Sequence, residues 1–212
     1  MNLESVAKLS INTSAPVANY MVSWRWVTEL LGLGHILADY EGYIQTDAYA
    51  GYNFIKKNPR QIHLGCWAHS RRRFFDAVKA AGENAEPGLA HEAIDIIKRL
   101  YQIEKHARLN ALDSEQIMEL RQAQAKPILT EFKSKLDKWT FMVTPKSLTG
   151  KAISYTLKIW DKLLVYINDG YLPIDNNIAE NIVRPFALGR KNWLFNDTVE
   201  GAKAAAIYFS IL

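Results

Sequence analysis

The stretch that decides the fold covers residues 43–82 and reads YIQTDAYAGYNFIKKNPRQIHLGCWAHSRRRFFDAVKAAG. Residues 43–46 form a strand-like run, and residues 61–66 form a second one. Residues 48–57 between them predict a short helix. From residue 67 to residue 82 the apolar side chains recur with a helical period, and a glycine closes the run. The order strand, helix, strand, helix predicts an α/β architecture.

Asp47 directly follows the first of these strands, at its carboxyl end. Open parallel sheets place functional side chains at that end, so Asp47 is a candidate site residue. In the alternative reading, the Asp47 carboxylate only caps the helix that follows.

The centre of the chain, residues 83–168, predicts helices throughout. One apolar stripe alternates spacings of four and three from residue 89 to residue 107, which is typical of a long amphipathic helix. A further stripe at residues 153–167 ends at an Asn-Asp-Gly turn.

The long helix needs a helical partner, which we expect at residues 117–139. Asp113 or Ser114 is its expected N-cap, and Pro127 predicts a break or kink. The two helices should form an antiparallel hairpin.

Composition and charge limit the class of protein. A chain of 212 residues with 49% hydrophobic content can bury one core, or one core and a helical lobe. The net charge is only +4, but seven cations lie between residues 56 and 79 against Asp76 alone. They are Lys56, Lys57, Arg60, Arg71, Arg72, Arg73 and Lys79. This concentration favours a polyanionic partner, and the alternative is an ordinary solvated helix face.

Cys66 is the one cysteine of the chain, so an internal disulfide is excluded. The first residues do not show the pattern of a secretory signal, and the longest apolar runs are far shorter than the roughly 20 residues that span a bilayer. We therefore expect a cytoplasmic protein with no membrane role.

A second informative tract covers residues 175–193 and reads DNNIAENIVRPFALGRKNW. Its carboxylate Glu180 can be read as one half of a capping box with Asn177. However, the tract has more capping residues than one helix can use, and a proline directly follows Arg184. Broken local rules of this kind indicate a functional constraint. Arg184, Arg190 and Lys191 are candidate phosphate contacts, whereas Trp193 suits the core.

Cys66 and His69 form a C-x-x-H pair. A structural zinc site needs four ligands, and the other histidines are scattered over different elements. They are His35, His63, His91 and His106. A zinc site is therefore not expected, and His69 is read either as a residue that orients a catalytic group or a DNA phosphate, or as a half-buried histidine.

Three motifs together resemble the insertion sequence 66 family of bacterial transposases. They are QTDAYAGY at residues 45–52, GCWAHSRRRF at residues 65–74, and the tract at residues 175–193. The resemblance runs from about residue 40 to residue 212. It implies an RNase H-like catalytic domain of the DDE type, in which divalent metal ions assist DNA cleavage and strand transfer.

The resemblance also assigns roles to residues. Asp47 matches the second catalytic aspartate and Glu180 the catalytic glutamate, so both would hold Mg²⁺ or Mn²⁺. His69, Asn176 and Asn177 would support the site. The expected DNA contacts are Arg71, Arg72, Arg184, Arg190 and Lys191. Of the three consecutive arginines, at most two can reach one DNA backbone, because they face different sides of a helix. The implied partners are transposon ends and target DNA, further copies of the chain, and accessory transposition proteins.

The implied fold is an RNase H-like core interrupted by an all-helical insertion. We expect a divergent or truncated N-terminal segment at 1–38, the first part of the core at 39–82, the helical insertion at 83–168, and the last part of the core, with the glutamate helix, at 169–212. Within the first segment, residues 20–31 suggest an edge strand and a short helix.

The first catalytic aspartate of such a site has no match upstream of Asp47. Glu4 and Asp39 are the nearest carboxylates, and neither lies in a suitable strand. We therefore expect impaired catalysis. The alternative is a non-catalytic DNA-binding or transposase-interacting remnant. A helical scaffold without a nucleic-acid role would instead spread its charge evenly.

Overall fold

A small parallel sheet forms one part of the molecule. In the computed structural model, residues 17–18, 40–47, 50–82, 86–178 and 180–181 are described. Strand β1 (Val17–Ala18) pairs with β2 (Gly42–Thr46), and β2 pairs with β3 (Gln61–Gly65), both in parallel. Thr46 lies opposite Gly65, so β2 and β3 end at the same edge of the sheet.

The two strands predicted from the sequence are confirmed, and a helical segment connects them. This connection is the 3₁₀ helix η1 (Ala50–Lys57), which replaces the short helix expected from residue 48. The edge strand expected at residues 20–31 lies outside the described residues.

Helix α4 (Trp67–Ala81) begins one residue after Cys66, which follows β3. Its buried residues are spaced by three, four and three: Trp67, Ser70, Phe74 and Ala77. The helix ends at Gly82, whose φ of +94° is accessible to glycine at little cost. This helix agrees with the predicted bounds.

The predicted helical hairpin is also present. Helix α5 (Leu89–Leu109) is followed by α6 (Ser114–Leu120), the π-helical turn η2 (Arg121–Ala125) and α7 (Lys126–Trp139). Of the two expected N-caps, Asp113 is the one used, since its side chain accepts a 2.9 Å hydrogen bond from the backbone N–H of Gln116. The helical path continues past Pro127, and the π-helical turn lies directly before it. Such a turn is a usual site for a kink that accommodates proline.

The single helix expected at residues 153–167 is wrong. The chain forms α8 (Leu148–Lys158), then α9 (Trp160–Leu164) and the 3₁₀ helix η3 (Val165–Asn168). The break falls at Ile159, where φ is −108° and ψ is 12°. Beyond it, the backbone of Leu163 packs so closely on Gly65 that an added Cβ there would lie 3.2 Å from the Leu163 nitrogen. The Trp67 indole N–H donates to the Leu163 carbonyl at 3.1 Å. The helix therefore changes direction at Ile159 so that α9 can cover β3.

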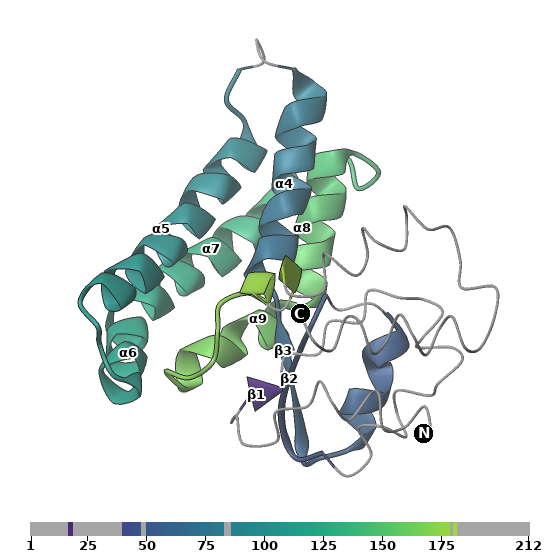
Figure 1. Cartoon of the computed structure of the whole chain (residues 1–212). Helices are drawn as coiled ribbons and strands as arrows, with labels where there is room; N and C mark the ends of the chain where they lie inside the picture. The colour runs from purple at the N-terminus through teal and green to yellow at the C-terminus, as the bar shows by residue number, and fades with distance from the viewer. Residues whose placement is uncertain (1–16, 19–39, 48–49, 83–85, 179, 182–212) are drawn as a thin grey trace, which may run out of the picture.

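Figure 1 shows α4 between α5 and α8, with the sheet at the amino end of α4. One hydrophobic cluster joins these parts, and aromatic rings lie at its centre. The Trp67 ring centroid is 6.2 Å from that of Phe132 and 5.9 Å from that of Trp160. The cluster contains residues from both sides of the domain boundary expected at residue 82.

The architecture is thus mixed α/β, with a small parallel sheet and mostly helices. The RNase H-like core and the domain boundaries stay predictions. Within the described ranges, every helix is too short or too polar to cross a lipid bilayer.

Candidate active site

Asp47 lies at the carboxyl end of β2, as predicted, and is half-buried. Its backbone carbonyl accepts a 2.8 Å hydrogen bond from the Tyr155 hydroxyl, which belongs to α8. Burial raises the pKa of Tyr155 to about 12; the nearby Asp47 charge also raises it, whereas Arg73 lowers it. Tyr155 therefore stays a neutral donor near neutral pH and fixes the end of β2 against the helices.

Glu180 lies beside His69, in the first turn of α4. The distance between Glu180 Oε1 and His69 Nε2 is 3.5 Å, and the two side chains are only 16% and 22% exposed. This is an ion-pair distance rather than a good hydrogen bond. Among the described residues, neither Glu180 Oε1 nor His69 Nδ1 has a hydrogen-bond partner, although both atoms are buried. Buried polar atoms of this kind need an explanation, and a bound ligand or ion is one.

The alternative reading of Glu180 as half of a capping box is wrong. The backbone N–H that it would cap, that of Asn177, donates instead to Asp175 Oδ1 at 3.0 Å. The Asn177 side-chain amide donates to Asp175 Oδ2 at 2.9 Å. Asp175 therefore caps the backbone N–H of Asn177, where this helical segment begins, and the Glu180 carboxylate is left for another role.

Four hydrogen bonds hold the segment before Glu180 in place. Two are made with backbone carbonyls of the segment: the Gln45 side chain donates to Pro173 at 3.1 Å, and the backbone N–H of Trp67 donates to Ile174 at 3.2 Å. Two are made with its side chains: the Tyr101 hydroxyl donates to Asp175 Oδ2 at 2.7 Å, and the Cys66 thiol donates to Asn176 Oδ1 at 2.9 Å. The donors come from β2, the start of α4 and α5, so several elements fix the position of Glu180.

Cys66 and His69 do not converge on one point. The Cys66 thiol faces the buried Asn176, and His69 faces Glu180. Burial raises the pKa of Cys66 to about 11, so the thiol is protonated and acts as a hydrogen-bond donor. Among the residues that the structure describes, the contact of Cys66 with Asn176 gives the thiol a structural role.

The three consecutive arginines face different directions. The Arg71 guanidinium lies 4.8 Å from the Phe75 ring centroid and 5.8 Å from that of Tyr101. Arg73 lies 3.9 Å from the ring centroid of Tyr155, on the α8 side, while Arg72 is exposed. Of the predicted DNA contacts, only Arg71 and Arg72 can be placed. Arg184, Arg190 and Lys191 lie outside the described residues, as do Trp193, Glu4 and Asp39.

Sequence reasoning gave no role at this site to four residues that the structure places here: Arg73, Tyr101, Tyr155 and Asp175. Asp175 belongs to the quoted C-terminal tract, and its place before two asparagines is a signal for a capping turn. The two tyrosines lie on helices far away in the sequence and carry no local signal.

The residues fit a divalent cation in part. Glu180 supplies a buried oxygen without a hydrogen-bond partner in the described chain, and Asp47 carries a carboxylate at the end of β2. Mg²⁺ and Mn²⁺ prefer such oxygen ligands. Where the chain is described, however, no three His, Cys, Asp or Glu side chains gather around one point.

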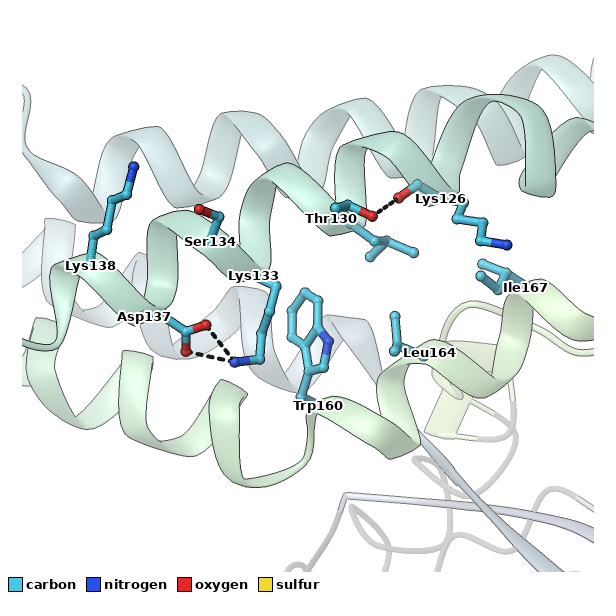
Figure 2. Close-up of a pocket in the computed structure, with 10 residues that line it drawn as sticks. Lys126, Thr130, Lys133, Ser134, Asp137, Lys138, Trp160, Leu164 and Ile167 are labelled. Carbon is cyan, nitrogen blue, oxygen red and sulfur yellow. Dashed lines mark hydrogen bonds and ion pairs between the residues drawn. The ribbon is translucent and has the colours of Figure 1, made fainter.

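A groove of about 610 Å³ lies elsewhere, between α7 and the segment formed by α9 and η3. In Figure 2, Trp160 and Leu164 line it from one side, while Lys126 and Lys138 extend from α7. Lys133 is paired there with Asp137 at 2.6 Å. None of the predicted site residues lines this groove.

Comparisons with known proteins agree with the motifs. The model of the Transposase IS66 family matches residues 16–204. The chain is 32% identical over 182 residues to the uncharacterized protein y4jD of Sinorhizobium fredii, covering 83% of this chain and 34% of that protein. It is 32% identical over 190 residues to the uncharacterized protein y4hP of the same organism, again covering 83% and 34%. The chain thus spans about a third of the length of the curated relatives it matches. No solved structure matches it.

Proposed function

The chain belongs to the Transposase IS66 family, and from this premise we propose that it forms part of a DDE-type catalytic domain that cleaves and joins DNA during transposition. The observation that carries the proposal is the position of Glu180. Its carboxylate lies 3.5 Å from His69, and α4, which carries His69, begins at the sheet edge where Asp47 follows β2.

In this proposal Asp47 and Glu180 hold Mg²⁺ or Mn²⁺. The bound ions would supply positive charge for the attacking and leaving oxygens of a phosphodiester. His69 orients the Glu180 carboxylate, as residues behind a metal ligand commonly do. Asn176 and Asn177 shape the turn that presents Glu180.

The chemistry consists of two displacements at phosphorus. In the first, a water oxygen attacks a phosphodiester at the transposon end; the bond from phosphorus to the 3′ oxygen breaks, and a 3′-hydroxyl and a 5′-phosphate form. In the second, this 3′-hydroxyl attacks a target phosphodiester, and the target strand leaves with a free 3′-hydroxyl. The chain's cations would hold the strands, with Arg71, Arg72, Arg184, Arg190 and Lys191 as the proposed contacts.

We expect the 212-residue chain alone to be a weak catalyst. Two carboxylates give fewer oxygen ligands than a two-metal site needs. Among the described residues, no three His, Cys, Asp or Glu side chains gather around one point. This observation favours the second candidate function, a DNA-binding or transposase-interacting protein without catalysis. Assembly with further copies and with accessory proteins stays a prediction.

The metal site can be tested without relying on catalysis. Fe²⁺ with ascorbate and peroxide produces hydroxyl radicals that cut a polypeptide near the bound ion. If Asp47 and Glu180 bind the ion, cuts should fall near residues 47 and 180, Mg²⁺ should compete, and Asp47→Asn with Glu180→Gln should remove them. Uniform cutting that the double variant does not change would refute the shared site.

The two candidate functions differ in one assay, the cleavage of a labelled transposon-end duplex with Mn²⁺. Slow cleavage that Glu180→Gln abolishes supports the transposase. Salt-dependent DNA binding without any cleavage supports the non-catalytic binder.

A further inference from the structure

Arg73 is held on the surface by an aromatic ring. Its guanidinium carbon lies 3.9 Å from the ring centroid of Tyr155, and the side chain is exposed. In the described part of the chain Arg73 makes no ion pair with a carboxylate. A ring contact of this kind orients the guanidinium plane and leaves N–H donors at its edge for another molecule.

Tyr155 links Arg73 to the end of β2. The tyrosine ring carries the guanidinium, while its hydroxyl donates to the Asp47 carbonyl at 2.8 Å. The position of Arg73 is therefore coupled to the strand end that carries a predicted catalytic carboxylate.

The same side of α4 carries both Arg73 and His69. The two residues are four positions apart, which places them one above the other on a helix. Since His69 lies beside Glu180, a cation stands one helical turn from the pair of His69 and Glu180. Arg71 differs, because its guanidinium is covered by Phe75 and Tyr101 toward α5.

From these contacts we propose that Arg73 and Tyr155 form a phosphodiester-binding site beside Asp47. The fork of guanidinium donors matches the oxygens of a phosphate. The position of Arg73 suits a DNA strand that reaches Asp47 and Glu180. The identity of the ligand as DNA rests on the proposed function, whereas the positioning of Arg73 by Tyr155 rests on the geometry alone.

The test measures binding of a labelled DNA duplex by fluorescence anisotropy in EDTA, over a series of salt concentrations. Arg73→Met keeps an apolar stem on the ring and removes the charge. We expect about a tenfold loss of affinity. The magnitude of the slope of log K against log salt should fall by about 0.9, because the variant makes one phosphate contact fewer and so releases fewer counterions. Arg73→Lys should restore most of the slope. Tyr155→Leu should weaken binding in the same direction, because the arginine loses its support.

The matched control is Arg108→Met, which removes the same charge from the exposed last turn of α5. It should leave the slope unchanged. Equal effects of Arg73→Met and Arg108→Met, or no effect of Arg73→Met on a wild-type chain that binds DNA, would overturn this site and leave the proposed function standing. Absence of salt-dependent DNA binding by the wild type would instead overturn the proposed function. Because Arg73→Met keeps an apolar stem on the Tyr155 ring, its thermal unfolding should stay close to that of the wild type, and measuring it separates a loss of binding from a loss of folding.

Discussion

His69 Nε2 and Glu180 Oε1 lie 3.5 Å apart and join the first turn of α4 to the helical segment that begins at Asn177. The contact brings together two of the motifs that are far apart in the sequence. Both side chains are mostly buried, so water screens their electrostatic interaction less than at a solvated surface. A carboxylate in this position can be oriented by the imidazole before any ligand binds.

We expect His69→Ala to weaken Mn²⁺ binding by about 10- to 100-fold, the usual cost of removing a group that orients a metal ligand. Electron paramagnetic resonance of free Mn²⁺ gives the affinity directly. His106→Ala, an exposed histidine near the end of α5, is the control and should bind like the wild type. An unchanged Mn²⁺ affinity in His69→Ala would show that the contact with Glu180 is only structural.

Arg71 and Arg72 should respond differently to removal. Arg72 is exposed, so Arg72→Ala should weaken DNA binding without changing the free energy of unfolding. Arg71 packs on two aromatic rings, so Arg71→Ala should also lower the free energy of unfolding, by about 1 kcal/mol. Anisotropy and urea unfolding separate the two effects. Equal loss of stability in both variants would contradict the assigned directions.

The periodicity of apolar residues predicted the strands and helices that end where their apolar pattern ends. The strands that end at Thr46 and Gly65 and the helix that ends at Gly82 fall where their apolar patterns stop. The break at Ile159 could not be predicted, because the apolar stripe continues through it. It results from the contact of α9 with Gly65, which is close in space only after folding.

The same reasoning applies to the candidate site. The placement of Asp47 at a strand end follows from the sequence alone. The neighbour of Glu180 does not, since the capping rule favoured Asn177 and the structure instead gives that backbone N–H to Asp175. The partnership of Arg73 with Tyr155 was also missed, because charge counting treats the three arginines alike and cannot identify the ring on α8.

A buried ion pair should control the stability of the helical part. Arg121 donates to both carboxylate oxygens of Glu104, at 2.9 and 2.7 Å, and to the carbonyls of Tyr166 and Asp169, each at 2.8 Å. Arg121→Met should lower the free energy of unfolding by about 3 kcal/mol, because Glu104 and two carbonyls lose their donor. The double variant with Glu104→Leu should recover part of this loss. Urea unfolding of the two variants measures both, and a double variant no more stable than Arg121→Met would contradict the cause given.

Gly65 should not tolerate a side chain. A Cβ at this position would lie 3.1 Å from Leu163 Cδ2, 3.2 Å from the Leu163 nitrogen and 3.3 Å from the Lys162 carbonyl carbon. Two of these atoms are backbone, and Trp67 holds the Leu163 carbonyl, so relief requires α9 to move. Gly65→Ala should lower the free energy of unfolding by about 1–3 kcal/mol. Gly88→Ala is the control, because a Cβ there meets no atom within 4 Å. Similar values for the two variants would argue against the close approach.

The stability of the chain should fall in alkaline solution because of Cys66. Burial raises the pKa of this thiol from 9.0 to about 11 in the folded state. Below pH 9 the thiol is protonated in both states, and its contribution to stability is fully present. As the pH rises from 9 to 11 the unfolded thiol ionises first, so stability is lost, by about 1.4 kcal/mol at pH 10 and about 2–3 kcal/mol above pH 11. Urea unfolding between pH 8 and pH 10 measures the loss before most of the tyrosine contribution begins. Cys66→Ser keeps a donor for Asn176 but does not ionise in this range, so its stability should fall less than that of the wild type, by only the part that the raised pKa values of Tyr101, Tyr155 and Tyr166 cause in both proteins. Parallel curves for the two proteins would show that the thiol is not buried against Asn176 as the structure describes.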